Sequence, residues 1–456
     1  MERYWNPELE TKPWPEVVAW QCQRVARMVT DLRDRSAFYR RKLTGAGAAP
    51  READAERWLA QLPFTHKDEL RQAQDAPLPG LPLGAQQAVE LRRVVRFVSS
   101  SGTTGRPVYY GLTGADVEAW ADGVANAFFT AGIREDDVVA HLVSLPMVAG
   151  GMAYALGFER IGAAVAWLGG LPPERMLESM AALRTSAVLA TTSFVRYLTE
   201  HGERLTGHPV RGLGVRKVLG GGEPGLGEEE IRTRVAAGWG TDHVRDTMGL
   251  GDVLASMWAE CDDVSGMHFN GQAHVLVELI DPVSQEPLPW REGMTGEAVY
   301  TTLDRQATPV LRFRSADHLV VTAISCRCGR TSPKVRCLGR TDDMLIYKGM
   351  NVFPTAIRDV ALDAAGEELE PQLRIWKEST SQVRFDHPIP VEVEARPAVA
   401  AERYPALARR IEDAVRSRLQ VRVAVTVVAP GTIPRAAYKT ALVQVRPPVQ
   451  GATGPG

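Results

Sequence analysis

One stretch constrains the fold of this chain more than any other: Phe97–Tyr109, with the sequence FVSSSGTTGRPVY. Serines, threonines and glycines follow one another there, and Arg106 and Pro107 close the run. Glycine lets a backbone turn sharply and approach a ligand, and successive N–H groups and hydroxyls can point at one anion. Phe97 and Val98 predict the end of a buried strand, and apolar residues at helical spacing begin after Thr113. A loop between a strand and a helix is a common place for a phosphate group, and a plain serine-rich surface loop is the alternative.

Short apolar runs alternate with helical patterns after this loop. The runs are VVAHLVS at Val138–Ser144, AAVAWL at Ala163–Leu168, AVLAT at Ala187–Thr191 and VRKVL at Val215–Leu219. This alternation favours an α/β fold in which parallel sheets are covered by helices.

The two ends of the chain have other patterns. Residues up to about Arg93 are helical in pattern, and LPFTHKDELR predicts a helix start with Thr65 as the N-cap. Towards the C-terminus, strand-like alternation at 382–393 and 421–428 flanks one apolar helical stripe. The stripe consists of Leu407, Ile411, Ala414, Val415 and Leu419. These patterns predict a small α+β domain of about 110 residues after the large α/β part.

Composition excludes several classes of protein. The chain has 456 residues, a hydrophobic fraction of 45 %, a charged fraction of 24 % and a net charge of −2. This balance gives no field for binding nucleic acid. No apolar run approaches the roughly 18 residues of a membrane helix, and the start MERYWNPELE lacks the apolar core of a signal peptide. We therefore expect a cytoplasmic enzyme whose 5 cysteines form no disulfide framework.

Two motifs resemble one known family. SSSGTTGRP does not match the P-loop pattern GxxxxGK[ST], but it resembles the nucleotide-phosphate loop of the adenylate-forming (acyl-CoA synthetase) superfamily. LGRTDDMLIYKGMNVFP at Leu338–Pro354 is similar, almost residue for residue, to the hinge GRxDDMLIxxGxNVFP of the phenylacetate-CoA ligase branch. The resemblance runs from about Leu62 to Lys439. It implies a large N-terminal adenylation domain at 1–340 and a small mobile C-terminal domain at 341–446. The tail at 447–456 is expected to be disordered because it belongs to the Pro/Gly-rich stretch VRPPVQGATGPG.

The resemblance also implies a nucleotide site. GGGEPG at Gly220–Gly225 is similar to the adenine-binding turn, and LRFRSAD resembles RYRTGD, whose final Asp accepts hydrogen bonds from ribose. The implied nucleotide-binding residues are Ser99, Ser100, Ser101, Gly102, Thr103, Thr104, Gly105, Gly221, Gly222, Glu223, Pro224, Asp246, Met248, Gly249, Asp317 and Arg340.

Three residues depart from the family's patterns. DTMGLGDV resembles YGLSE, but Met248 stands where the family has an aromatic residue. Asp252 is the implied acidic Mg²⁺ ligand and is shorter than the Glu of the family pattern. PRAAYK resembles PRxxGK, so Lys439 is the implied catalytic lysine, and Tyr438 stands where the family has glycine. Asp342 is the implied hinge residue, since a hinge needs few positions to absorb a rotation.

An acyl pocket is implied by the segment Ser144–Gly162. Its Gly-rich turn contains Met147, Gly150, Gly151 and Met152, and the family has an aromatic side chain where Met147 or Met152 stands. This difference favours an acid other than plain phenylacetate. Alternatively, these glycines only permit close helix packing.

A metal site is predicted by four scattered residues. Cys261 and His268 lie in ECDDVSGMH, and Cys326 and Cys328 lie in SCRCGR. Three thiolates and one imidazole make a closed tetrahedral zinc set, which is structural because no position is left for a substrate. Some phenylacetate-CoA ligase relatives carry the same set. Small buried thiols without a metal are the alternative.

The function implied by the resemblance has two steps. An aromatic carboxylate attacks the α-phosphate of ATP with Mg²⁺ present, and coenzyme A then takes the acyl group. Two alternatives stay open: an adenylase that passes an aryl or amino-aryl acid to an amine, a carrier protein or another nucleophile, and an inactive nucleotide-binding homologue. A homodimer is one assembly left open.

Overall fold

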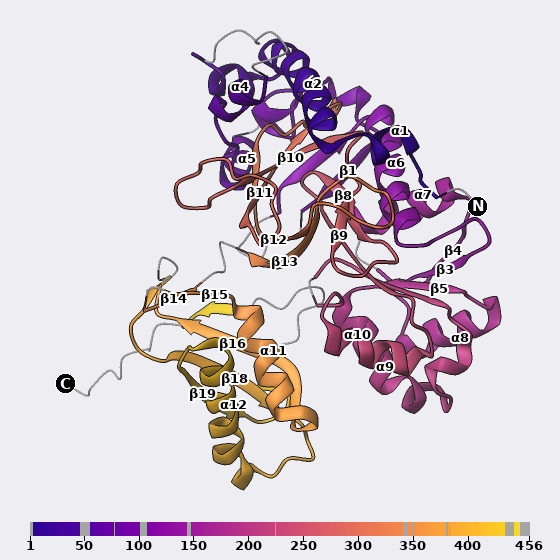
Figure 1. The fold of residues 1–456 in the computed structure, drawn as a ribbon, viewed down its shortest axis with the longest axis vertical. Coiled ribbons are helices and arrows are strands. Elements are labelled where there is room, and N and C mark those ends of the chain that lie inside the picture. Colours follow the sequence, from indigo (N-terminus) through magenta and orange to yellow (C-terminus); the bar gives the residue numbers. More distant parts are fainter. Residues whose placement is uncertain are drawn as a thin grey trace. The chain divides into compact units, whose positions relative to one another are not determined.

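The chain divides into two compact units, Met1–Cys337 and Leu338–Gly456 (Figure 1). The structure is a computed structural model that describes residues 3–45, 55–76, 78–100, 107–143, 147–223, 225–340, 345–348, 350–379, 382, 384–433 and 442–446. None of the described helices is both long and apolar enough to span a bilayer.

Helices dominate the start of the first unit, as its sequence pattern predicts. They are α1 (Pro7–Thr11), α2 (Trp14–Arg35), α3 (Ala37–Lys42), α4 (Ala55–Gln61) and α5 (Lys67–Asp75). The prediction of Thr65 as an N-cap is wrong, because α5 begins two residues later and its first turn is closed by Glu69, which accepts the N–H of His66. The Thr65 hydroxyl instead donates to Leu311 O at 2.7 Å.

The core of the first unit is one mixed sheet. Among the described strands its order is β10-β11-β12-β13-β9-β8-β7-β6-β5-β3-β4. The part from β7 to β4 is parallel, as the βα alternation predicts, and the pairs of β7 with β8, β8 with β9 and β10 with β11 are antiparallel. The bounds are β3 (Val138–His141), β4 (Ala164–Trp167), β5 (Ala187–Ala190), β6 (Lys217–Gly220), β7 (Val244–Leu250), β8 (Leu254–Glu260), β9 (Met267–Phe269), β10 (Val275–Ile280), β11 (Thr295–Thr302), β12 (Phe313–Ala323) and β13 (Lys334–Arg340).

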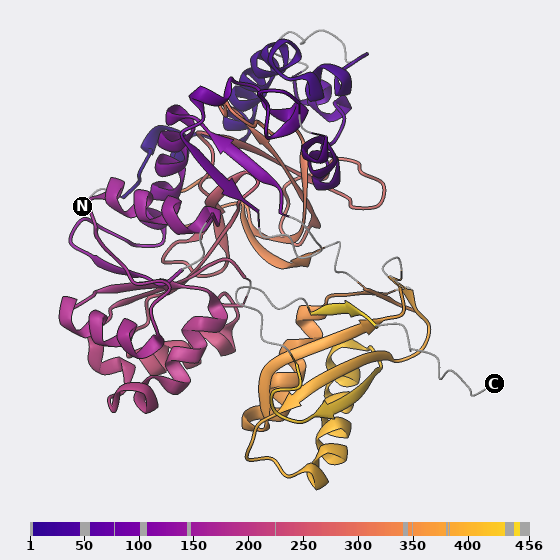
Figure 2. The same ribbon diagram turned by 180° about the vertical axis from the view of Figure 1, so that it is seen from behind.

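Helices cover both faces of the parallel part (Figures 1 and 2). α6 (Gly114–Thr130) and α7 (Ala149–Ile161) lie on one face, and α8 (Pro173–Leu183), α9 (Thr192–Thr206) and α10 (Glu229–Trp239) lie on the other. α6 begins where predicted, because the Thr113 hydroxyl caps it by accepting the N–H of Asp116.

The strand before the phosphate loop is not the buried strand that we predicted. Among the described strands, β1 (Arg96–Ser99) pairs with β2 (Tyr109–Leu112) in a two-stranded antiparallel sheet. Val98 is buried, but Phe97 is 42 % exposed. Successive residues of a strand point to opposite faces, so only one face of this short ribbon packs on the core.

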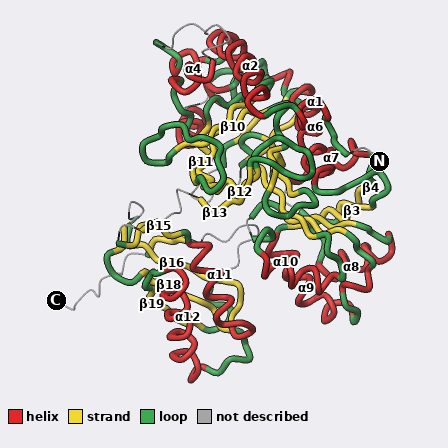
Figure 3. Tube along the Cα trace, viewed as in Figure 1, coloured by secondary structure: helices red, strands yellow, loops and turns green. Residues whose placement is uncertain are grey.

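The second unit is a small α+β structure with its own core (Figure 3). Its sheets have the orders β15-β14-β17 and β19-β18-β16-β20, and α12 buries Leu407, Ile411 and Val415 from the predicted stripe. The bounds are β14 (Leu345–Tyr347), β15 (Met350–Val352), α11 (Pro354–Ala365), β16 (Leu369–Lys377), β17 (Arg384–Phe385), β18 (Ile389–Ala395), α12 (Tyr404–Leu419), β19 (Val423–Val428) and β20 (Val443–Val445).

Candidate active site and metal centre

Backbone hydrogen bonds hold the first two residues of the predicted phosphate loop. Ser99 donates its N–H to Met147 O at 2.7 Å and forms a bridge with Val148. Ser100 donates its N–H to Val108 O at 3.0 Å. The predicted phosphate loop and the predicted acyl segment are therefore joined at the first residue of the loop. The rest of the loop lies outside the described residues, namely Ser101, Gly102, Thr103, Thr104 and Gly105.

Asp252 is held by three residues that are distant from it in the sequence. It is 4 % exposed and accepts a hydrogen bond from the Tyr110 hydroxyl at 2.7 Å. Lys67 Nζ lies 3.3 Å from Asp252 Oδ1, and Arg305 Nη1 donates to Asp252 O at 2.6 Å. Burial and the charge of Asp252 raise the pKa of Tyr110 well above its ordinary value, so the phenol is protonated and acts as a donor.

Gly251 places the predicted phosphate, acyl and magnesium segments against one another. A Cβ at Gly251 would lie 3.1 Å from Ala149 Cβ, 3.4 Å from Ser99 O and 3.6 Å from Ser100 Cα. Segments from β1, α7 and the turn between β7 and β8 therefore meet within van der Waals distance. A glycine is suited to this position because each neighbour approaches its backbone closely.

The acyl segment forms the first turn of α7, and two of its methionines are accessible. Met147 has φ +63°, a left-handed conformation that is uncommon for residues other than glycine, and it is 46 % exposed. Met152 is 47 % exposed. A Cβ at Gly150 would lie 3.0 Å from the ring of Tyr154, which stands one turn later in the same helix.

A buried histidine supports the same turn. Gly151 O lies 2.7 Å from His141 Nε2, and the His141 ring stacks on Trp167 with centroids 5.3 Å apart. Burial lowers the pKa of His141 to about 4, so the imidazole is neutral at pH 7 and its Nε2–H donates to the Gly151 carbonyl.

The predicted adenine turn follows β6 and packs on β7. A Cβ at Gly221 would lie 2.8 Å from Thr247 Oγ1, and Gly222 has φ +82°. The Glu223 carboxylate accepts the N–H of Ser193 at the start of α9. Pro224 lies outside the described residues.

Asp246 lies on β7 beside this turn. Its carboxyl accepts the N–H of Gly227 at 3.1 Å, and burial together with the charge of Glu260 raises the pKa of Asp246 to about 8. Met248 pairs with Trp258 across to β8, and a Cβ at Gly249 would lie 2.1 Å from Ala255 O. No side chain fits at Gly249 without moving the backbone of β8.

The remaining predicted nucleotide residues lie on β12 and β13. Asp317 is 8 % exposed, and its N–H donates to Ser315 Oγ at 3.0 Å. Arg340 is the last residue of β13. Asp342 and Lys439 lie outside the described residues.

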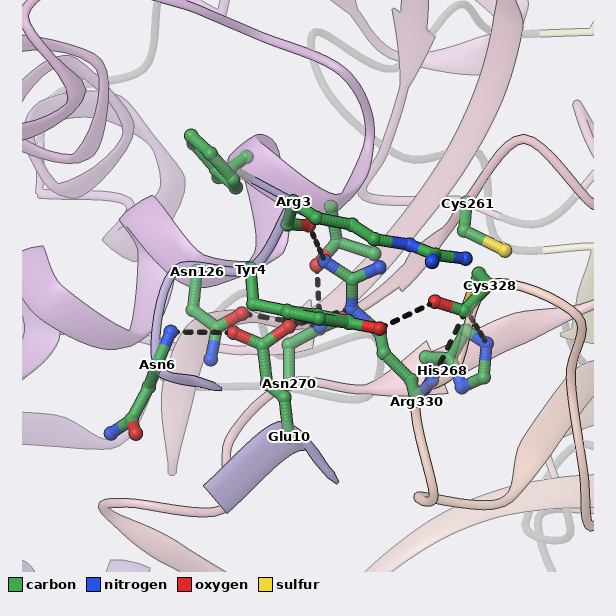
Figure 4. Close-up of polar contacts among 12 residues, drawn as sticks. Arg3, Tyr4, Asn6, Glu10, Asn126, Cys261, His268, Asn270, Cys328 and Arg330 are labelled. Atoms are coloured by element: carbon green, nitrogen blue, oxygen red, sulfur yellow. Dashed lines mark hydrogen bonds and ion pairs between the residues drawn. The ribbon is translucent and has the colours of Figure 1, made fainter. Parts of the chain in front are cut away.

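The four predicted metal ligands come together in the first unit, and Figure 4 shows three of them, Cys261, His268 and Cys328. The ligand atoms of Cys261, His268, Cys326 and Cys328 all lie within 4.8 Å of one another. Cys261 Sγ is 3.7 Å from Cys326 Sγ, and Cys328 Sγ is 3.3 Å from His268 Nε2.

The surroundings of this Cys/His cluster favour metal binding. His268 Nδ1 lies 3.1 Å from Ser332 O, so Nδ1 carries the proton and Nε2 is left as a ligand atom. A hydrogen bond from the Cys261 thiol lowers the pKa of Cys328. A thiolate together with a correctly oriented imidazole fits tetrahedral zinc.

Comparison with known proteins decides the family. Residues 349–444 match the family described as AMP-binding enzyme C-terminal domain. The phenylacetate-coenzyme A ligase of Thermus thermophilus is 33 % identical over 94 % of this chain and 96 % of its own length.

The chain belongs to the phenylacetate-CoA ligase family.

Solved structures agree with this assignment. A 2-hydroxyisobutyryl-CoA ligase in the postadenylation state, in complex with 2-HIB-AMP, has a TM-score of 0.84 and 26 % identity, covering 98 % of this chain and 93 % of that one. The same ligase in complex with 2-HIB-AMP and CoA in the thioesterification state has a TM-score of 0.69 and 27 % identity, covering 97 % and 92 %. The protein is thus an adenylate-forming ligase that joins an acid to CoA and uses ATP.

In this ligase the N-terminal segment lies across the Cys/His cluster (Figure 4). The Tyr4 hydroxyl donates to Cys328 O at 2.9 Å, and Arg3 donates to Arg327 O at 2.9 Å. Glu10 forms an ion pair with Arg330 at 2.7 Å, and Glu10 is fully buried. Residues 3–12, here named the N-terminal strap, are therefore fastened to the loop that carries two of the cluster's cysteines.

Sequence reasoning missed several residues of the site. Lys67, Tyr110 and Arg305 around Asp252 were not predicted, and neither were His141 and Tyr154 near the acyl turn. Lys67 had one signal, because it is the lysine of THKDELR, which resembles a TxKxxLR stretch at the family's N-terminus.

Proposed function

We propose that this ligase activates an aromatic carboxylic acid with ATP and Mg²⁺ and transfers the acyl group to CoA. The observation that carries the proposal is the convergence at Gly251, where the residues expected to bind phosphate, acid and metal meet in one place. Holding two reactants in reach of each other is a large part of what an adenylating enzyme contributes.

The nucleotide would lie along the carboxyl ends of β6 and β7. Ser99 to Gly105 would hold the β- and γ-phosphates, and the flat adenine ring would lie against the backbone of Gly221 and Gly222. Asp317 would accept hydrogen bonds from the ribose hydroxyls. Arg340 would donate to ribose or phosphate oxygens.

Asp252 would hold Mg²⁺ between phosphate oxygens. Mg²⁺ prefers hard oxygen ligands and is commonly bound by one or two carboxylates plus phosphate. The Tyr110 hydroxyl fixes one oxygen of Asp252 at 2.7 Å, whereas Lys67 Nζ, 3.3 Å from the same oxygen, is a cation that Mg²⁺ would have to displace. The Asp252 carboxylate offers oxygen ligands of the kind that Mg²⁺ takes, even though Asp replaces the family's longer acidic residue.

An aromatic acid is supported by the side chains near the acyl turn. Tyr154, His141 and Trp167 surround the first turn of α7, and ring contacts link His141 to both other residues. The flexible Met147 and Met152 side chains are accessible, and thioethers pack well against aromatic rings. We propose that Met147 and Met152 contact the ring of an aromatic acid other than plain phenylacetate.

The small domain would supply the catalytic lysine. Lys439 would neutralise charge between the acid's carboxylate and the α-phosphate, which a compact ammonium does without bidentate geometry. Rotation of 341–446 about Asp342 would then withdraw Lys439 and admit the CoA thiol. Such a movement separates two reactions in time.

Zinc would be held by Cys261, His268, Cys326 and Cys328. Because all four positions are protein ligands, the ion would stabilise the loop at 326–332 and take no part in adenylation.

Acid-dependent ATP–pyrophosphate exchange, measured over a panel of aryl and aliphatic acids with and without CoA, tests this proposal. We expect exchange with aryl acids and acyl-CoA in the products. Exchange confined to aliphatic acids would refute the aromatic substrate, and an acyl product on an added amine in place of CoA would favour the non-CoA alternative.

A further inference from the structure

The loop between β11 and β12 carries an arginine that reaches under the proposed magnesium ligand. Arg305 is 6 % exposed, and its Nη1 donates to the carbonyl oxygen of Asp252 at 2.6 Å. A buried guanidinium with a single short contact to a backbone carbonyl loses much of its hydration, so its position requires an explanation. Among the described residues, its Nε and Nη2 have no hydrogen-bond partner.

Arg305 also contacts the residue that fixes the side chain of Asp252. Its Cζ lies 5.0 Å from the centre of the Tyr110 ring and 5.3 Å from that of Trp120. The Tyr110 hydroxyl donates to Asp252 Oδ1 at 2.7 Å. One guanidinium therefore holds the backbone of Asp252 directly and holds its carboxylate through the tyrosine. Cation–π contacts of this kind are stronger when both groups are desolvated.

The position of Arg305 is itself fixed by Asp116 at the start of α6. The Asp116 carboxylate accepts the backbone N–H groups of Gln306 at 2.6 Å and of Ala307 at 3.1 Å. It also accepts the N–H of Thr113 at 2.8 Å. The loop that carries Arg305 is thus attached to the helix N-terminus, which limits the movement of the guanidinium.

We infer that Arg305 is a positioning residue for Asp252. The inference rests on the proposed role of Asp252 as the Mg²⁺ ligand. A carboxylate that must meet a small octahedral ion tolerates little displacement, because Mg²⁺ demands near-ideal geometry. The hydrogen bond from Arg305 fixes the position of the Asp252 backbone carbonyl, and the hydrogen bond from Tyr110 fixes the orientation of the Asp252 carboxylate.

The test measures metal binding rather than turnover. Mn²⁺ is titrated with the full-length enzyme in the presence of α,β-methylene ATP, and the bound ion is followed by water-proton relaxation enhancement. We expect Arg305→Met to weaken Mn²⁺ binding about tenfold, and Arg305→Lys, which keeps a donor, to weaken it less.

A matched control is Arg134→Met. Arg134 also donates to backbone carbonyls, those of Phe129 at 2.6 Å and Ile133 at 2.7 Å, and it lies on the Phe129 ring at 3.8 Å. It lies on the turn after α6, and none of the predicted nucleotide-binding residues is among these hydrogen-bond and ring partners. The control variant should bind Mn²⁺ as the wild type does.

Two further outcomes separate this inference from the proposed function. If Asp252→Asn leaves Mn²⁺ binding unchanged, the proposed metal role of Asp252 is wrong. If Asp252→Asn weakens binding and both Arg305 variants bind like wild type, the positioning role of Arg305 is wrong while the metal role stands. If Arg305→Met does not fold, Arg305→Lys and Arg305→Gln decide the question by the same titration.

Discussion

The carboxylate of Glu10 and the guanidinium of Arg330 meet at 2.7 Å in the interior of the protein. Glu10 is fully buried and Arg330 is 5 % exposed. Burial raises the pKa of Glu10, although the charge of Arg330 acts in the opposite direction. Removing one partner of such a pair leaves a buried charge, which commonly costs about 3–5 kcal/mol.

We therefore expect Arg330→Met to lower the free energy of unfolding, measured by urea denaturation, by about 3–5 kcal/mol. The double variant Arg330→Met with Glu10→Gln should recover part of this loss, because no unpaired charge is left. Equal destabilisation by the single and the double variant would contradict the charge argument.

Metal removal should release the N-terminal strap. Tyr4 and Arg3 bind carbonyls of Cys328 and Arg327, in the loop that the proposed zinc would hold. A chelator, or Cys326→Ser, should increase hydrogen exchange of residues 3–12 while exchange in β3 and β5 stays constant. Cys337→Ser is the control, because Cys337 is not among the four clustered ligands. Unchanged exchange of the strap after proven metal loss would show that the loop is ordered without the ion.

The stability of the first unit should decrease with rising pH because of Asp246. Its pKa is raised from 3.8 to about 8, chiefly by burial and then by Glu260, so the folded state binds a proton that the unfolded state releases. The stabilisation is complete below about pH 4 and is lost as the pH rises to about 8, by at most about 1.4 kcal/mol per pH unit.

Thermal unfolding between pH 5.5 and 8 checks this. The melting temperature of Asp246→Asn should depend less on pH than that of the wild type. Asp281→Asn is a control, because backbone N–H groups of Ser284 and Val283 lower the pKa of Asp281 and it does not titrate in this range. Identical slopes for wild type and Asp246→Asn would mean that Asp246 is ionised throughout.

Lys439→Ala should abolish adenylation and spare thioester formation from a supplied acyl-adenylate. The ammonium is proposed to act only in the first step, where charge builds on the α-phosphate. Pyrophosphate exchange measures the first step, and acyl-CoA release from the acyl-adenylate measures the second. Similar losses in both steps would contradict the role given to Lys439.

Local patterns in the sequence predicted much of this fold. The helix after Thr113, the buried stripe of α12 and the parallel strands β3 to β6 depend on residues a few positions apart, which periodicity and capping describe. The predicted cysteines and histidine do lie together, although 65 residues separate Cys261 from Cys326. They could be predicted because thiols and an imidazole are the usual ligands of one metal ion. The prediction that Phe97 is buried is wrong, because the residues of a strand do not show how many strands pair with it or which of its faces is covered.

What the sequence by itself determined is the kind of chemistry: a Ser/Thr/Gly loop, an acidic residue at 252, a Cys/His set and the family to which these motifs belong. Only the tertiary structure decided which groups meet. Lys67, Tyr110 and Arg305 stand 185, 142 and 53 residues from Asp252, yet all three contact it. The strap contacts a loop more than 300 positions away, with 324 between Tyr4 and Cys328. The reason is physical: propensity and capping act within a few residues, whereas such contacts follow from the order of strands in a sheet and from the packing of buried side chains.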